Sequence, residues 1–416
     1  MATTRTEKDK KDTMGPIQVA ADRYWGAVAG IFAAFLRLGF TSFGGPIAHL
    51  GYFRVEFVER RRWLSEAGYA ELVALCQLLP GPASSQVGFA VGLSRAGIPG
   101  GVAAWLGFTL PSALALVLFA RGAALLTGPL GTGILHGLQV AAVAVVAQAV
   151  WSMAQSLAPD RPRAAIVVAS TLVVSLVSGS RAQIAAIVLG AAAGLWLCRA
   201  APAVPSGRLV TPVSRARAVG ALALFLALLV GLPAVVIVSA SPAAVVAEAF
   251  YRTGSLVFGG GHVVLPLLEA AVVEPGWVSR EAFLSGYGAA QAVPGPLFTF
   301  AAYLGVVMTA PGGWSGAALC LVAIFLPGLL LVLGVLPLWD VLGRRAGVQA
   351  AVRGVNAAVV GVLLAALYDP VWTGGIGGRA DFALALVAFG LLVVWKAPPW
   401  VVVLLSAAGG VLIRVG

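Results

Sequence analysis

Two short Pro-Gly-Pro sequences constrain this chain more than any other feature. They occupy residues 80–82 and 294–296, each inside a long apolar segment, and each follows a glutamine by three positions, Gln77 and Gln291. Proline removes a backbone donor and clashes with the preceding helical turn, and glycine tolerates conformations that other residues avoid. Each sequence therefore predicts a helix that is broken partway along an apolar segment.

The two breaks belong to a longer repeat. A Phe-Gly-Gly sequence precedes each one, at residues 43–45 and 258–260, and the offset between the copies is 214 to 215 residues. Further pairs match at nearly the same offset: Arg37 with Arg252, Gly39 with Gly254, residues 63–65 with 277–279, Pro111 with Pro327, and Gly137 with Gly354. The chain therefore contains an internal duplication.

Composition indicates a membrane protein. Of the 416 residues, 60% are hydrophobic and only 10% are charged, whereas soluble domains carry about a quarter charged residues. Repeated apolar stretches have the roughly 17–25 residues that are needed to cross the hydrocarbon layer. The net charge of +11 lies mostly between these stretches, where positive-inside topology signals lie. We therefore expect a lipid bilayer, and no nucleic acid, as partner.

Enzyme and metal chemistry are poorly supported. Cys76, Cys198 and Cys320 are scattered in apolar segments without CxxC spacing, so neither a disulfide framework nor a zinc site is expected. No Walker, GxSxG or HExxH sequence is present. We expect no cofactor, no metal and no catalytic residue, and hence a protein that is not an enzyme.

The apolar segments divide the chain into four parts. We expect a polar cytoplasmic tail at 1–23, a first transporter repeat at 24–199, a linker with an unpaired central membrane helix at 200–242, and a second repeat at 243–416. The expected fold class is an all-α polytopic membrane protein with broken helices and about 10–13 membrane segments. An odd central helix would make the repeats antiparallel, which is the inverted plan of many secondary transporters.

Positive charge predicts a cytoplasmic N-terminus, but one connection disagrees. If the first apolar segment crosses the membrane, Arg54 and residues 60–62 lie on the outside. A chain that folds back at residues 44–46 would remove this conflict and change the number of spans. The sequence leaves both topologies open.

Both breaks have the chemistry of an anion site. Lipid cannot satisfy the backbone groups that a broken helix exposes, so each break must face protein or water. The helix that restarts presents free amides and a positive dipole end. The alternative is a packing kink, and the repetition favours a ligand site. The candidate substrate-binding residues are Arg37, Gly44, Gly45, Gln77, Pro80, Gly81, Pro82, Arg252, Gly259, Gly260, Gln291, Pro294, Gly295 and Pro296.

The side chains in this set have alternatives of their own. An arginine within the membrane suits a tetrahedral oxyanion because its guanidinium donates in a planar fork; Arg37 and Arg252 could instead extend to lipid headgroups. The glutamines could join helices by hydrogen bonds. For proton coupling, the candidates are Glu71, the carboxylate deepest in an apolar segment, and His49 and His262, which flank the glycine pairs.

The motifs resemble a known family. The stretch from Phe43 through Trp63 to Pro82, and its counterpart from Phe258 to Pro296, are similar to the signatures of the chromate ion transporter (CHR) family. The resemblance covers essentially the whole chain beyond the tail. It implies the long-chain, two-domain form, an inner-membrane transporter that exports chromate with the proton motive force, confers chromate resistance and is subject to interference by sulfate.

Three questions stay open on the sequence. Chromate and sulfate are tetrahedral dianions of similar size, so a transporter of sulfate or another oxyanion is the main alternative. An integral-membrane chromate reductase is a remote one, because no flavin or haem motif is present. A duplicated chain can act as a monomer or as a homodimer.

Overall fold

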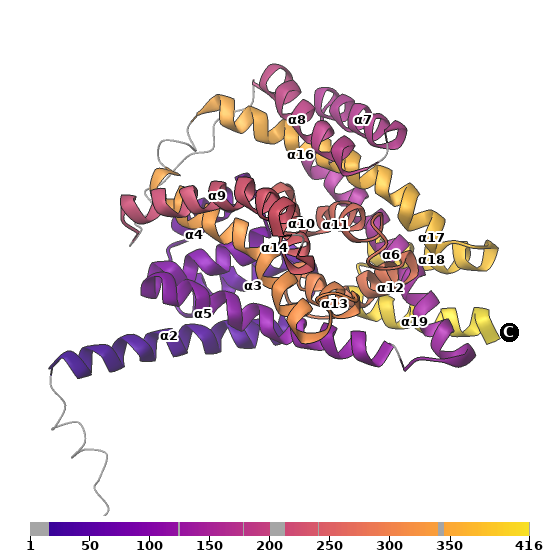
Figure 1. The fold of residues 1–416 in the computed structure, drawn as a ribbon, viewed down its shortest axis with the longest axis horizontal. Coiled ribbons are helices and arrows are strands. Elements are labelled where there is room, and N and C mark those ends of the chain that lie inside the picture. Colours follow the sequence, from indigo (N-terminus) through magenta and orange to yellow (C-terminus); the bar gives the residue numbers. More distant parts are fainter. Residues whose placement is uncertain are drawn as a thin grey trace, which may run out of the picture.

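The structure, a computed structural model, describes residues 16–123, 125–177, 179–199, 213–239, 241–339 and 345–415, and every regular element in these ranges is helical (Figure 1). The elements of the first half are α2 (Pro16–Thr41), α3 (Gly45–Arg54), η1 (Val55–Arg60), α4 (Glu66–Leu78), α5 (Ala83–Ala123), α6 (Gly128–Leu157), α7 (Arg161–Leu176) and α8 (Ser180–Leu197). The others are α9 (Arg215–Ser239), α10 (Pro242–Leu256), η2 (Gly261–Val263), α11 (Val264–Val272), α12 (Arg280–Ala290), η3 (Leu297–Thr299), α13 (Phe300–Val307), α14 (Gly313–Val335), η4 (Leu336–Leu338), α16 (Ala346–Ala366), η5 (Leu367–Trp372), α17 (Thr373–Gly375), α18 (Arg379–Val393) and α19 (Pro399–Val415).

The predicted all-α membrane class is confirmed. Six helical stretches in the described residues are long and apolar enough to cross a membrane: Tyr24–Thr41, Ala83–Ala123, Gly128–Leu157, Arg215–Ser239, Gly313–Leu338 and Ala346–Gly375. Four shorter apolar helices accompany them: Arg181–Leu197, Gly261–Val272, Leu297–Val307 and Pro399–Arg414. Helix α2 begins at Pro16, within the predicted polar tail, and residues 1–15 and most of the predicted linker (200–212) lie outside the described residues.

Helix α5 consists of two limbs joined by a tight turn. The backbone leaves helical conformation at Ala96 and Gly97. Because a Cβ built on Gly92 would collide with the carbonyl of Gly100, residues eight positions apart face each other, which a continuous helix does not permit. Limbs 83–95 and 98–123 therefore form an antiparallel hairpin. In the second half, α13 and α14 form the same hairpin, with Gly305 facing Gly316.

The α5 turn marks one end of the molecule, here called the first end. The hydroxyl of Tyr24, early in α2, donates a hydrogen bond of 2.9 Å to the Ala96 carbonyl. The guanidinium of Arg95 lies 5.5 Å from the centre of the Trp63 ring. The beginning of α2, the α5 turn and the connection before α4 therefore lie together at this end.

The chain folds back after α2. The ring of Phe35 on α2 packs against Phe53 on α3 at 5.5 Å and against Phe57 on η1 at 4.8 Å, measured between ring centroids. Because α3 and η1 run back along α2, Arg54 and residues 60–62 lie at the same end as the beginning of α2. Of the two topologies that the sequence leaves open, the structure has the one that reverses at residues 44–46.

The corresponding turn of the second half lies at the opposite end. The second limb of α5 has a helical rise of about 39 Å, and Arg121 at its far end lies 5.9 Å from the centre of the Trp314 ring, at the start of α14. Equivalent hairpin turns of the two halves are therefore separated by the length of this limb.

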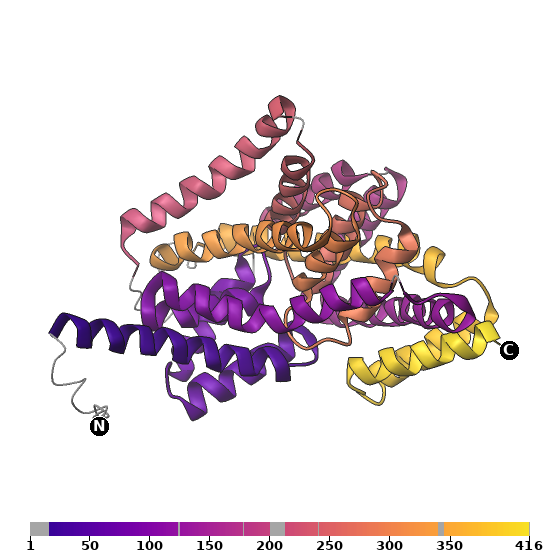
Figure 2. The ribbon, with the colours of Figure 1, turned by 60° about the horizontal axis from the view of Figure 1, so that its bottom comes forward.

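The two halves interlock. Helix α6 of the first half packs against α18 and α19, and α16 of the second half packs against α7 and α8 (Figure 1). Glycines permit both contacts: a Cβ on Gly137 would collide with the Ser406 carbonyl, and one on Gly354 with the Gly190 carbonyl. The repeats are thus not two separate bodies in space. The unmatched helix α9 leans away from the rest before α10 turns back (Figure 2), and among its side chains only Ala218 and Ala221 are buried.

Candidate functional site

The chain leaves helical conformation at both Pro-Gly-Pro sequences. Residues 79–82 separate α4 from α5, and residues 291–296 separate α12 from η3. The central glycines have positive φ angles, 122° at Gly81 and 102° at Gly295, a region that side chains other than hydrogen disfavour. The glycine in each motif is therefore required by the backbone geometry of the break.

Each break is bonded to the opposite half of the chain. The Gly81 amide donates a hydrogen bond of 2.7 Å to the Val257 carbonyl, and the Gly295 amide donates one of 2.9 Å to the Ser42 carbonyl. Val257 and Ser42 each stand directly before a Phe-Gly-Gly sequence. The Pro-Gly-Pro of one half thus pairs with the Phe-Gly-Gly of the other, and the pairing is reciprocal.

A cavity lies at each of these two junctions. The first cavity, of about 220 Å³, is lined by Gly44 and Gly45 of the first half and by Gln291 and Gly295 of the second. The second cavity, of about 360 Å³, is lined by the reciprocal set, Gln77 and Gly81 with Gly259 and Gly260. Eight of the fourteen predicted substrate residues therefore line the two cavities, four in each. The four prolines lie within the breaks beside them.

One face of α6 runs past both cavities. Val145 and Gln148 line the first cavity, and Ser152 and Ser156 line the second. Spacings of three and four residues place these side chains on the same side of a helix. Pro46, at the beginning of α3, lines both cavities. The cavities are therefore neighbours along α6, with Pro46 between them.

The walls offer mainly neutral side chains and backbone groups. Helix α3 begins at Gly45 beside the first cavity, and η2 begins at Gly261 beside the second, so the first amides of both helices are without an intrahelical acceptor. The Oδ1 atom of Asn356 on α16, which lines the second cavity, is buried without a hydrogen-bond partner among the described residues. Such groups can bind a ligand that both donates to and accepts from amides, or a hydrated anion.

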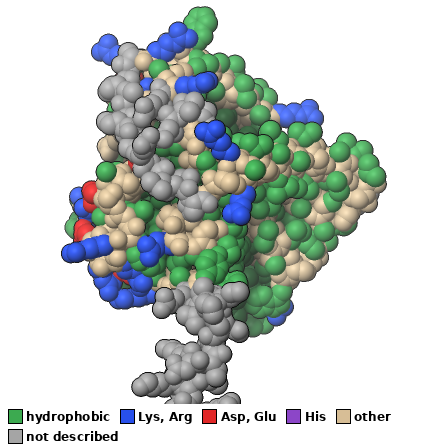
Figure 3. Space-filling model, turned by 90° about the vertical axis from the view of Figure 1, so that its left-hand side faces the viewer, with side chains coloured by type: hydrophobic (Ala, Val, Ile, Leu, Met, Phe, Trp, Pro, Cys, Tyr) green, Lys and Arg blue, Asp and Glu red, His purple; other side chains and the backbone are tan. Residues whose placement is uncertain are grey.

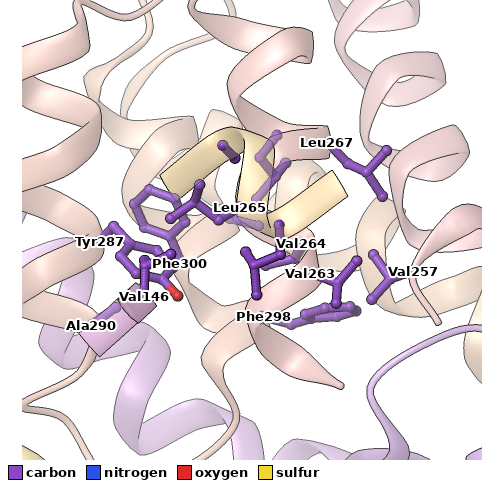
Figure 4. Packing of buried hydrophobic residues seen from close by; sticks show 14 of the residues in the cluster. Val146, Val257, Val263, Val264, Leu265, Leu267, Tyr287, Ala290, Phe298 and Phe300 are labelled. Atoms are coloured by element: carbon purple, nitrogen blue, oxygen red, sulfur yellow. The ribbon is translucent and has the colours of Figure 1, made fainter. Parts of the chain in front are cut away.

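Apolar packing fixes the wall formed by the second half. Val257 directly after α10, Val263 in η2 and Leu265 in α11 pack with two residues that follow the second Pro-Gly-Pro, Phe298 and Phe300 (Figure 4). All five side chains are at most 1% exposed. Close packing of this kind holds the break and the glycine pair in a fixed relation.

The two predicted arginines lie away from both cavities. Arg37 is exposed on α2, and Arg252 forms an ion pair of 2.7 Å with Glu248, one turn earlier on α10. Neither side chain lines a cavity. Their role in substrate binding stays a prediction that the geometry does not favour.

The two predicted histidines have different surroundings. His262 lines the first cavity, and its Nδ1 atom lies 2.8 Å from the Tyr287 hydroxyl. His49 is buried behind the α2–α3 reversal, where its ring nitrogens lie 3.2 Å from the Ser42 carbonyl and 3.3 Å from the Ser84 hydroxyl. Of the two, only His262 is placed to meet a ligand in a cavity.

Glu71 is buried on α4, and its Oε1 atom accepts a hydrogen bond of 3.1 Å from the indole nitrogen of Trp339. It lines neither cavity. The bond joins the first half to the end of α14–η4, so it lies between elements of the two halves.

The family of this protein follows from its sequence. A family model described as "Chromate transporter" matches the chain twice, over residues 29–196 and 244–411. The chain belongs to the chromate transporter family. The two matched ranges also confirm the internal duplication, since each half matches the same family model.

Curated relatives agree with membership of the chromate transporter family. The chromate transport protein of Pseudomonas aeruginosa is 29% identical over 91% of this chain and 90% of its own length. The probable chromate transport protein of Synechococcus elongatus is 27% identical over 91% and 93%, and the chromate transport protein of Cupriavidus metallidurans is 28% identical over 80% of each chain. All three are named as transport proteins. No solved structure matches this chain.

Several polar residues near the site were not singled out from the sequence. Gln148, Asn356 and Lys396 line the cavities, and His136 on α6 forms a pair of 2.7 Å with Asp381 on α18. An isolated polar residue in an apolar helix was the available signal for Gln148, Asn356 and His136. None of these residues belongs to the Phe-Gly-Gly or Pro-Gly-Pro sequences that occur in both halves.

Proposed function

We propose that this chain exports chromate from the cytoplasm across the inner membrane, driven by the proton motive force, and thereby confers chromate resistance. The observation that carries the proposal is the reciprocal pairing of each Pro-Gly-Pro with the Gly-Gly of the opposite half. It produces two equivalent ligand-sized cavities from backbone that is not helical. Such backbone is tolerated in a bilayer where it lines a cavity.

In this mechanism the anion is held by the protein's own dipoles and amides. Helix α3 begins at Gly45 beside the first cavity, and the free amides at a helix start attract anions. Gln291 and Gln77 add side-chain amides at matched positions, one in each cavity. Chromate would pass from one cavity to the other along the polar face of α6, past Pro46.

The two halves are proposed to form an inverted repeat, with the first at 24–199 and the second at 243–416. The opposite placement of the α5 turn and the α13–α14 turn supports this arrangement. An inverted pair gives alternating access a simple basis. When the two halves exchange conformations, a site that was open to one side of the membrane opens to the other. Helix α9, within the region 200–242, supplies the odd crossing that the inversion requires.

The first end is proposed to face the cytoplasm. Figure 3 looks onto the side of the molecule where α2 begins, and Lys and Arg side chains gather there. Arg95 and Arg61 lie at the Trp63 ring at this end, in agreement with the positive-inside tendency. This orientation also gives the N-terminus a cytoplasmic position.

For proton coupling, His262 and Glu71 are the proposed residues, with His49 in a supporting position. His262 borders the first cavity and can exchange a proton beside the anion. Glu71 joins α4 to the end of α14–η4, so a change in its charge would act on the contact between the halves. Coupling requires a contact with two alternative arrangements, and both the proton and chromate must change the balance between them.

The test is accumulation of labelled chromate in everted membrane vesicles that contain this chain. We expect uptake that stops when an uncoupler collapses the proton gradient. Vesicles with a His262→Ala chain should retain chromate exchange but lose gradient-driven accumulation. Uptake that is indifferent to the uncoupler would contradict proton coupling, and absence of uptake would contradict chromate export.

A sulfate transporter is the second candidate, because neutral amides recognise charge and size rather than the central atom of a tetrahedral dianion. Uptake of labelled chromate in excess sulfate, and uptake of labelled sulfate, by the same vesicles distinguish a chromate transporter from a sulfate transporter. Chromate uptake that persists, with little labelled sulfate transported, favours chromate as substrate. Sulfate uptake without chromate uptake would assign the second candidate, and loss of hexavalent chromium in the presence of the purified protein would indicate a reductase.

A further inference from the structure

We propose that Lys396 is the cation that binds the oxyanion at the mouth of the first cavity. This inference rests on the proposed function and names one more residue for it. Lys396 lies in the turn between α18 and α19, outside both repeated motifs, and it lines the first cavity together with Gly44, Gly45 and Gln291.

The backbone of Lys396 is held in a conformation that a lysine rarely adopts. Its φ angle is +52°, in the left-handed region, where glycine is the usual residue. A hydrogen bond of 2.9 Å from the Ala397 amide to the Leu391 carbonyl closes the turn around it. A strained residue beside a cavity points to a role for its side chain, because a glycine would form the same turn more easily.

The charge of Lys396 has no counterpart in the site. Among the described residues, it is the one ionisable side chain besides His262 that lines the first cavity, and no Asp or Glu of these residues lines either cavity. Within the described ranges, no ion pair is formed by its ammonium group. An ammonium group without a protein counterion, in the cavity where α3 begins, is available for a dianion.

The path of α18 places Lys396 beside the middle of α6, next to the first cavity. Helix α18 begins near the start of α6, where Asp381 contacts His136. It ends with Leu392 packed in the same cluster as Val145, further along α6. Since α6 starts after the far end of α5 and runs back, the turn at Lys396 points toward the first end. The second cavity lies further along α6 in that direction, so the exposed side chain can bind an anion that has passed from it into the first cavity.

An interfacial lysine that contacts only lipid headgroups is the competing interpretation. Trp395 precedes Lys396 in the turn and Trp400 lies in the first turn of α19, and their exposed fractions are 71% and 39%. Tryptophans of this kind gather at the membrane interface. A headgroup contact would make the lysine charge irrelevant to chromate affinity, which is the difference that the experiment measures.

The experiment compares chromate uptake by everted vesicles that contain the full chain with Lys396→Gly, Lys396→Arg or no substitution. Because glycine accepts the φ angle of this turn, Lys396→Gly removes the charge without straining the backbone. We expect its half-saturating chromate concentration to rise about tenfold or more, since a hydrogen bond to a charged group is lost. Lys396→Arg, which keeps the charge, should stay within about threefold of the unsubstituted chain.

The chain provides a matched control. Arg62 is the other residue besides glycine with a positive φ angle in the described part of the chain, at +51°, and it lines neither cavity. Arg62→Gly should leave the half-saturating concentration unchanged. An unchanged value for Lys396→Gly, or an equal rise for Arg62→Gly, would overturn the assignment of Lys396.

A binding measurement separates this inference from the proposed function. The affinity of the purified, full-length protein for inorganic sulfate is measured by calorimetry, with and without Lys396→Gly. If vesicles transport no chromate but sulfate binding weakens in the variant, chromate export is wrong and the Lys396 site stands. If both proteins bind sulfate equally, or if neither binds sulfate or chromate in the same measurement, the Lys396 site is wrong.

Discussion

Gly81 and Gly295 each meet two requirements that other residues do not. Both adopt positive φ angles, and both lie where a side chain would strike a neighbour. A Cβ on Gly295 would lie 2.8 Å from the Ser112 hydroxyl, and one on Gly81 would lie 2.9 Å from the amide nitrogen of Gln86. The substitution of either residue would therefore disturb the break and its bond to the opposite half.

The first prediction concerns these glycines. Gly81→Ala and Gly295→Ala should each lower the initial rate of chromate uptake at least about tenfold, because the positive φ alone costs an alanine roughly 1–2 kcal/mol. Initial uptake rates, normalised to the amount of protein in the membrane, provide the measurement. Gly122→Ala is the control, since a Cβ there meets nothing within 4 Å. Normal uptake by both break variants would contradict the proposed site.

The second prediction concerns the arginines. Arg37→Ala removes a side chain that is exposed and lies outside both cavities, so chromate uptake should keep at least about half of its rate, as surface substitutions usually have small effects. The measurement is uptake together with growth on chromate. If Arg37→Ala abolishes both while the protein still reaches the membrane, the sequence-based assignment of Arg37 as a ligand is right and the cavity walls are not the whole site.

The residue scale shows why sequence motifs identified only part of the site. A Pro-Gly-Pro sequence determines its own backbone, so the breaks and the glycines were predictable from local chemistry. Arg37 and Arg252 were matched in the repeat, but a match does not say which way a side chain faces. Lys396 has no counterpart among the matched pairs of the repeat. Its left-handed backbone conformation could not be predicted from the neighbouring residues.

At the scale of helices, apolar length was the reliable signal. The sequence predicts a central membrane helix within residues 200–242, and the structure has α9 at Arg215–Ser239. The length of an apolar segment does not show in which direction the chain continues after it. The reversal after α2 depends on contacts of Phe35 with Phe53 and Phe57, which are far apart from it in the chain.

The third prediction concerns the link between α6 and α18. His136 and Asp381 are mostly buried, and the Gly377 amide donates a further hydrogen bond of 2.9 Å to the Asp381 carboxylate. Removing one partner leaves the other without its hydrogen bond, so His136→Ala and Asp381→Ala should each destabilise the protein by about 1–3 kcal/mol. The measurement is the thermal unfolding temperature of the purified protein in detergent.

A double-mutant comparison decides whether the pair acts as a unit. If His136 and Asp381 stabilise the protein through each other, the double variant should unfold at a temperature close to those of the single variants. A decrease equal to the sum of the two single decreases would show that they act independently.

At the scale of the whole molecule, the interlocked halves explain why the site could not be assembled from sequence. Each motif was recognised within its own half, but each cavity needs one motif from each half. Which Pro-Gly-Pro meets which Gly-Gly depends on α6 and α16 crossing into the opposite half, and such long-range contacts leave no local pattern. The duplication was visible, but its reciprocal pairing was not.

The fourth prediction follows from the interlocking. Residues 1–199 and 213–416, expressed as separate chains, should each fail to transport chromate, because α6 and α16 would lose the helices that cover them. Expressed together they should restore uptake, since the described residues that line the two cavities all lie in one part or the other. Uptake by the first part alone would show that one repeat, paired with itself, suffices.

The most direct measurement of the central claim is the position of chromium in the protein. Crystals of the purified chain soaked in chromate, with data collected at the chromium absorption edge, would locate the ion by anomalous scattering. The reciprocal pairing of the halves predicts an anomalous peak in the first cavity, between Gly44–Gly45 and Gly295. A peak in the second cavity, between Gly259–Gly260 and Gly81, would agree equally. A peak at Arg37 or Arg252, with both cavities empty, would contradict it.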